Sequence, residues 1–161
     1  MASERNWITF VCTANTCRSP MAAALFKHAL LAQKEPLCSI EVESAGVSAL
    51  TGEPVSNNAA RALEEVGLDI SDHRSYQLTY QLLRRSFAVF CMTESHRVLI
   101  EMSFDNPPKH LYLMRELIPN TQELTIPDPF GLNINAYRAC RDSMVEAIPP
   151  IINFLKKHYP Q

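Results

Sequence analysis

Short apolar runs alternate with longer segments of helical character along the chain. Residues 7–11, Trp-Ile-Thr-Phe-Val, form an almost wholly apolar run of the kind that a parallel strand buried on both faces shows. Similar runs at 40–44, 86–92 and 110–114 predict three further strands. Because the runs are separated by helical segments, the pattern predicts an α/β fold with a parallel sheet.

Start and stop signals mark two of the helices. Ser19 can act as an N-cap, with Pro20 at the first helical position and a run of helix formers behind it. Ser56 can cap another helix, which we expect to run through Glu65 and to stop at Gly67. Each helix would thus follow a predicted strand.

The pattern predicts a last helix over residues 137–158. Pro149 and Pro150 lie inside it, and because neither donates a backbone N–H, we expect an interruption or kink there. No repeat, low-complexity tract or linker divides the chain, so residues 1–161 are predicted to form a single domain.

Composition narrows the function classes. The 161 residues are 47% apolar and carry a net charge of -2, so we expect neither nucleic acid nor an anionic membrane as a partner. Residues 1–6 are polar, and no apolar run approaches the ~18 residues of a membrane span. The five cysteines lack the spacing of a zinc site or a disulfide framework, which predicts reduced thiols, no bound metal and a cytoplasmic location.

The first predicted strand leads into the loop Cys-Thr-Ala-Asn-Thr-Cys-Arg-Ser-Pro at residues 12–20. Backbone N–H groups of such a loop converge on phosphoryl oxygens, and the Arg18 guanidinium can hold two of them while the Cys12 sulfur lies below the phosphorus. The spacing therefore predicts a cysteine nucleophile for phosphoryl transfer. We expect the other loop residues to line the bound group: Thr13, Ala14, Asn15, Thr16, Cys17 and Ser19.

Several residues of this loop have predicted roles. Asn15 tolerates the left-handed conformation that points successive N–H groups inward, and Ser19 can hydrogen-bond the thiolate. A helix N-terminus and Arg18 are expected to lower the pKa of Cys12, unless Cys12 is merely a small buried residue. Cys17 is expected to pack in the loop, or else to capture oxidised Cys12 in a disulfide.

A second Cys-x5-Arg match, from Cys91 to Arg97, serves as an internal control. It places Glu94 where an anion would bind, lacks a residue tolerant of positive φ, and continues with Val98 instead of a hydroxyl. We expect no catalysis from it.

The loop at residues 11–20 resembles the phosphate loop of the low-molecular-weight protein tyrosine phosphatase family. Later landmarks of that family have counterparts in order: Ser44-Ala-Gly-Val47, Asp69-Ile-Ser-Asp-His-Arg74, Ala88-Val-Phe-Cys-Met-Thr93 and Asp128-Pro-Phe-Gly131. The resemblance covers essentially the whole chain. It implies a four-stranded parallel sheet flanked by helices, no metal or cofactor, phosphorylated proteins as substrates and inorganic phosphate as product.

The resemblance also assigns roles outside the loop. Asp128 matches the general acid, a role that its exposed Pro-Asp-Pro turn suits, although it could be an ordinary turn residue. Asn15, Ser44 and His73 resemble the network that holds the loop open, although His73 could instead lie on the surface. The other four histidines show no ligand spacing and are expected to be solvated: His28, His96, His110 and His158.

Two departures from the usual pattern of the family's phosphotyrosine enzymes indicate which phosphorylated residue is the substrate. Thr16 stands where phosphotyrosine enzymes of the family usually carry a branched aliphatic residue, and the acid loop has Phe130 where two adjacent aromatics are frequent. Both features resemble the protein-arginine phosphatase branch, although Ala14 stands where that branch usually has glycine. A hydroxyl at Thr16 and a carboxylate at Asp128 suit a polar guanidinium better than hydrocarbon does.

Phosphoarginine hydrolysis through a phosphocysteine is thus the predicted reaction, with phosphotyrosine as the alternative substrate. A thiol arsenate reductase would need a resolving cysteine pair, which Cys91 and Cys140, 49 residues apart, do not resemble. A non-catalytic phosphate-binding module would have lost Cys12, Arg18 or Asp128, and all three are present.

Overall fold

The computed structural model describes residues 5–161, so the first four residues of the polar stretch 1–6 lie outside the described part. Its four parallel strands have the order β2-β1-β3-β4. β1 (Trp7–Cys12) lies between β2 (Glu41–Gly46) and β3 (Ser86–Cys91), and β4 (Leu111–Leu113) pairs with β3 at the edge. The predicted four-stranded parallel sheet is confirmed, with strand ends shifted by one or two residues.

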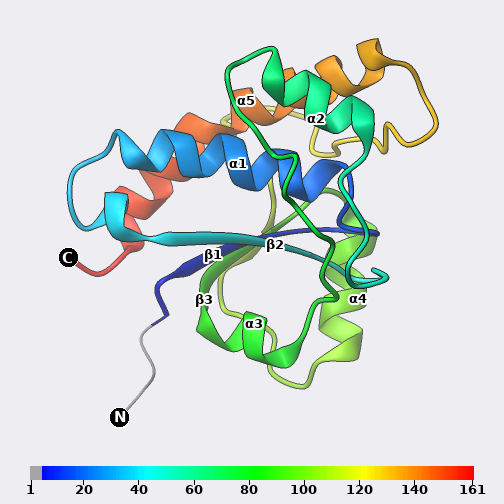
Figure 1. Ribbon diagram of the computed structural model, residues 1–161. Helices are drawn as coiled ribbons and strands as arrows, with labels where there is room; N and C mark the ends of the chain where they lie inside the picture. Colours follow the sequence, from blue (N-terminus) through cyan, green and yellow to red (C-terminus); the bar gives the residue numbers. More distant parts are fainter. Residues whose placement is uncertain (1–4) are drawn as a thin grey trace.

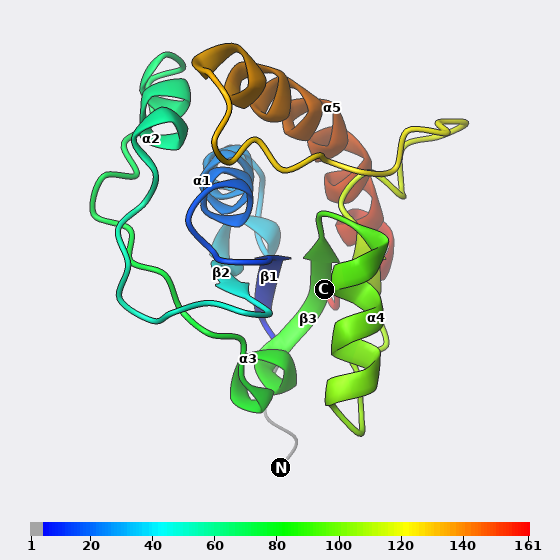
Figure 2. The same ribbon diagram turned by 90° about the vertical axis from the view of Figure 1, so that its right-hand side faces the viewer.

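Helices cover both faces of the sheet (Figures 1 and 2). α1 and α5 pack on one face together with α2, whereas α3 and α4 lie on the other. Their bounds are Arg18–Leu31 for α1, Asn57–Glu64 for α2, Tyr80–Arg85 for α3, Glu94–Ser103 for α4 and Ile134–His158 for α5, with a 3-10 turn at Leu37–Ser39. No helix in residues 5–161 is long and apolar enough to cross a membrane.

The alternation of side chains along β1 builds the two halves of the core. Ile8 and Phe10 are fully buried toward α1 and α5, and the Phe10 ring lies 5.5 Å from that of Phe26 and 5.7 Å from that of Phe90. Val11 points to the opposite face, into the cluster formed with α3 and α4. β1 is therefore buried on both sides, as its apolar run predicts.

The start of α1 differs from the sequence prediction. Ser19 lies within the first turn, and the N-cap position belongs to Cys17, which makes no side-chain capping bond. The Ser19 hydroxyl cannot cap the helix because it faces back toward Cys12 and Asn15. In contrast, Ser56 caps α2 as predicted, accepting a hydrogen bond from the N–H of Ala59.

The segment after β3 forms a helix that the sequence analysis did not predict. Thr93 caps α4, so the second Cys-x5-Arg match becomes a strand end and a helical turn instead of an anion loop. The guanidinium of Arg97 binds the carboxylates of Glu94 and Glu116, each at 2.6 Å. Because these acidic partners already hold it, this arginine is not presented to a phosphate.

An interruption or kink was predicted in the last helix, and the interruption is wrong. α5 begins at Ile134 and continues through Pro149 and Pro150 to His158. The two prolines remove backbone donors, but buried residues on both sides, Ile148 and Ile151, keep the helix against the core. Packing outweighs the local preference here.

Gly46 ends β2 directly against the loop that follows β1. A Cβ at this position would lie 2.4 Å from the carbonyl oxygen of Thr13 and 3.1 Å from the carbonyl carbon of Ala14, both backbone atoms. The loop carbonyls of Cys12 and Thr13 accept hydrogen bonds from the N–H groups of Val47 and Ser48. The absence of a side chain at Gly46 thus lets β2 hold the loop closely.

We predict that Gly46→Ala lowers the free energy of unfolding by about 1–3 kcal/mol, since backbone must shift to admit the methyl group. Phosphatase activity should fall further than stability alone explains, because the displaced atoms belong to the loop. Denaturant titration and turnover of an aryl phosphate measure both. Gly52→Ala is the control: it strains a residue at φ 99° in open space, and should cost stability without changing turnover.

Candidate active site

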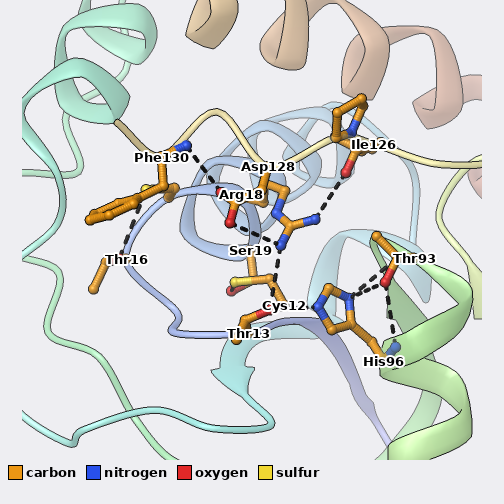
Figure 3. A network of polar contacts seen from close by, with 12 residues as sticks. Cys12, Thr13, Thr16, Arg18, Ser19, Thr93, His96, Ile126, Asp128 and Phe130 are labelled. Carbon is orange, nitrogen blue, oxygen red and sulfur yellow. Dashed lines mark hydrogen bonds and ion pairs between the residues drawn. The ribbon is translucent and has the colours of Figure 1, made fainter. Parts of the chain in front are cut away.

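The loop after β1 and the start of α1 enclose a pocket of about 160 Å³ at the carboxyl end of the sheet. Figure 3 shows this region, with Asp128 and Phe130 approaching from the segment before α5. Ser19, which was also expected to line the bound group, is fully buried behind Cys12 and Asn15 and does not line the pocket. The other predicted residues do line it: Cys12, Thr13, Ala14, Asn15, Thr16, Cys17, Arg18, Asp128 and Phe130.

The Cys12 sulfur is buried and surrounded by donors. It lies 2.9 Å from the Ser19 hydroxyl oxygen, and the N–H of Asn15 donates to it at 3.3 Å. Burial nevertheless raises the pKa of the Cys12 thiol, while the Ser19 and Asn15 hydrogen bonds and the Arg18 charge lower it. The expected net lowering of the Cys12 pKa is therefore not found, because the loss of hydration at the sulfur outweighs its donors.

Asn15 holds the loop in shape. Its φ of 60° is the predicted left-handed conformation, which turns its own N–H toward the sulfur. Its side-chain amide donates to Ser19 at 2.7 Å and to Ser44 at 2.9 Å, and its amide oxygen accepts from the N–H of Tyr76 at 2.9 Å. His73 donates from Nε2 to the Asn15 carbonyl at 2.8 Å. Ser44 and His73 thus lie where a loop-supporting network requires them.

Ala14, where the resemblance led us to expect glycine, does not have a positive φ. Alanine therefore suits this backbone without strain.

Arg18 is buried beneath the pocket with its guanidinium fixed at two points. One terminal nitrogen donates to the carbonyl of Ile126 at 3.0 Å, and the other donates to the Thr13 hydroxyl at 3.5 Å. The second nitrogen also lies 3.8 Å from a carboxylate oxygen of Asp128. Both contacts of the second nitrogen are long, so that nitrogen can turn to an anion in the pocket.

Asp128 and Phe130 form the exposed wall of the pocket. The N–H of Phe130 donates to Asp128 at 3.1 Å, which fixes the turn, and the Asp128 side chain is 53% exposed. Phe130 is 72% exposed and lines the same pocket as Thr16. A carboxyl group in this place can exchange protons both with a leaving group and with water.

One residue of this region escaped the sequence analysis. His96 is 3% exposed, contrary to the expectation of a solvated side chain, and its Nε2 lies 2.9 Å from the Thr13 hydroxyl oxygen. Burial and the Arg18 charge lower its pKa to about 4. The signal was present in the sequence, because Thr93 and His96 have the spacing of a helix capping box with histidine in place of the usual Glu or Gln.

The remaining histidines lie away from the pocket. His28 and His158 are exposed, as expected. His110 is only partly exposed and lies 4.9 Å and 5.2 Å, centroid to centroid, from the rings of Phe87 and Phe154, so the expectation of a solvated side chain was wrong for it.

The other cysteines differ from Cys12 in their position and contacts. Cys17 contacts the hydroxyls of Ser56 at 3.4 Å and Tyr137 at 3.5 Å, which is a packing position at the base of the loop. Cys91 lies in β3 and Cys140 in α5, and burial raises the pKa of Cys140 to about 12. All five thiols are free in the structure.

No cluster of three or more His, Cys, Asp or Glu side chains that could hold a metal ion occurs within the described residues.

Comparison with known proteins gives the family. The sequence model of the family described as "Low molecular weight phosphotyrosine protein phosphatase" matches residues 7–161. The chain belongs to this family. It is 39% identical to a protein-arginine-phosphatase of Geobacillus stearothermophilus over 85% of this chain and 87% of that protein. It is 36% identical to the protein-arginine-phosphatase of Bacillus subtilis over 93% of this chain and 97% of that protein.

The fold of the chain is also that of solved structures in this family. The YwlE arginine phosphatase, solved as a cysteine-to-serine mutant with a phosphorylated active-site serine, superposes with a TM-score of 0.84 at 33% identity. That match covers 95% of this chain and 97% of the other. The fold expected from the resemblance is thereby confirmed.

Proposed function

We propose that this protein is a protein-arginine phosphatase that works through a phosphocysteine at Cys12. The observation that carries the proposal is a family phosphate loop whose pocket is lined by Thr16 and Asp128. The relatives named as protein-arginine phosphatases support the same substrate. The proposal includes phosphorylated proteins as partners, inorganic phosphate as product and a cytoplasmic location, which the five free thiols fit.

In the first step, the Cys12 sulfur attacks phosphorus and a sulfur–phosphorus bond forms while the phosphorus–nitrogen bond breaks. Asp128, protonated, gives its proton to the departing guanidinium nitrogen. The loop N–H groups and Arg18 balance the charge of the phosphoryl oxygens in the transition state. The products of this step are arginine and a phosphocysteine.

In the second step, water attacks the phosphocysteine and Asp128 takes its proton. The sulfur leaves as a thiolate, and inorganic phosphate is released. Ser19 suits this step because its oxygen accepts the Asn15 amide N–H at 2.7 Å, so its own O–H can act as a donor. The Cys12 sulfur at 2.9 Å is a nearer acceptor for that O–H than the Ala45 carbonyl at 3.4 Å. That hydrogen bond stabilises the thiolate both as nucleophile and as leaving group, against the effect of burial on the pKa.

Thr16 separates the two substrate classes. An arginine side chain presents N–H donors at the pocket wall, and an unpaired N–H there would cost about 1–3 kcal/mol. The Thr16 hydroxyl can accept such a donor, whereas a phenyl ring gains nothing from it. Phosphotyrosine is the second candidate because the family also includes enzymes such as the probable tyrosine phosphatase EpsP of Ralstonia solanacearum, 32% identical over 81% of this chain.

Asp128→Asn should reduce turnover by roughly 10²–10⁴-fold for substrates with a poor leaving group. The loss should be smaller for an activated aryl phosphate, which departs without a proton. Steady-state rates on the two kinds of substrate measure the difference. An equal loss on both would assign Asp128 to binding instead of proton transfer.

The substrate is tested by turnover of phosphoarginine and phosphotyrosine peptides of matched sequence. The wild type should prefer phosphoarginine. Thr16→Ile should lose phosphoarginine activity and keep or gain phosphotyrosine activity, a change of about 1–3 kcal/mol in relative transition-state binding, since a hydrogen-bonding hydroxyl is replaced by hydrocarbon. A wild type that prefers phosphotyrosine, or a variant that loses both activities alike, would favour the tyrosine phosphatase alternative.

A further inference from the structure

His96 forms a bridge between the cap of α4 and the wall of the pocket. Its ring nitrogen Nδ1 lies 3.2 Å from the backbone nitrogen of Thr93, and its Nε2 lies 2.9 Å from the hydroxyl oxygen of Thr13. Figure 3 shows the imidazole between the two threonines. The loop and α4, which lie on different crossovers of the fold, are thus joined through one buried side chain.

The hydrogen bonds determine which ring nitrogen carries the proton. A backbone N–H only donates, so Nδ1 must accept from Thr93 and is unprotonated. The neutral ring then carries its proton on Nε2 and donates it to Thr13. The lowered pKa of His96 keeps the ring in this neutral form.

The donors and acceptors around the Thr13 hydroxyl can be assigned in the same way. Its oxygen accepts from His96 and, at the longer distance of 3.5 Å, from Arg18. With both lone pairs engaged, the hydroxyl proton is the one group that Thr13 has left to donate. Thr13 is an exposed residue that lines the pocket beside the Arg18 guanidinium.

From these contacts we infer that the Thr13 hydroxyl is a hydrogen-bond donor to a phosphoryl oxygen in the pocket, and that His96 is the positioning residue that orients it. The inference rests on the proposed function only in taking a phosphoryl anion as the ligand; it does not depend on the amino acid that carries the phosphate. It gives α4 a part in anion binding without contact between α4 and the substrate.

A double-mutant cycle on inorganic phosphate binding, measured by calorimetry, tests the inference. Thr13→Val should weaken phosphate binding about 10- to 100-fold, the usual effect of losing a hydrogen bond to a charged group. His96→Asn keeps an acceptor for the Thr93 N–H but no longer reaches Thr13, and should weaken binding about three- to tenfold. In the Thr13→Val background, the same histidine change should have less than a twofold effect.

His96→Gln is the rescue variant, because its longer amide can again donate to Thr13, and it should bind within about threefold of the wild type. Val98→Ala, on an exposed turn of α4, controls for changes in the helix itself and should leave binding unchanged. Thermal unfolding of every variant verifies that the measured protein is folded.

Two results would overturn the inference. One is undiminished phosphate binding by Thr13→Val. The other is a loss of phosphate affinity on His96→Asn that is equally large in the wild type and in Thr13→Val. Because binding is measured without turnover, a wild type that fails on phosphoarginine would contradict the proposed function and leave this inference standing.

Discussion

The site depends on the left-handed backbone of Asn15. At φ 60° the residue turns its N–H toward the Cys12 sulfur, and its side chain at the same time binds Ser19, Ser44 and the backbone of Tyr76. Four segments of the chain are therefore tied to one residue in a conformation that few side chains tolerate. These internal hydrogen bonds fix the shape of the loop, and a loop held in this way needs little reorganisation when charge develops on a phosphoryl group.

The pocket divides into a fixed base and an exposed wall. Cys12, Asn15 and Arg18 are buried and bonded on several sides, whereas Asp128 and Phe130 stand on an exposed turn. The base supplies the charge and the nucleophile that any phosphate ester or phosphoramidate requires. The exposed wall determines which substrate is preferred, because Thr16 and the turn that begins at Asp128 would contact the group that carries the phosphate.

The sequence revealed the parallel sheet and the loop because both leave local signals: apolar runs for buried strands, and the Cys-x5-Arg-Ser spacing with Asn15 inside it. It excluded an anion loop at Cys91 to Arg97 but did not reveal α4, because the Thr93 cap carries histidine in place of the usual Glu or Gln and Arg97 pairs with Glu116, 19 residues away. His96 was missed for a related reason. The spacing of Thr93 and His96 is a local sign of the helix start, but the contact of His96 with Thr13, 83 residues away in the chain, leaves no local signal.

The central claim is that Cys12 itself carries the phosphoryl group. Reaction with a radiolabelled phosphoarginine peptide, stopped by a denaturing quench at alkaline pH and followed by peptide mapping, tests it directly. The account predicts label on the peptide that contains Cys12, more of it in Asp128→Asn if release is slowed, and none on cysteine in Cys12→Ser. Label on another residue of the wild type, such as Cys17, or rapid turnover by Cys12→Ser, would contradict it.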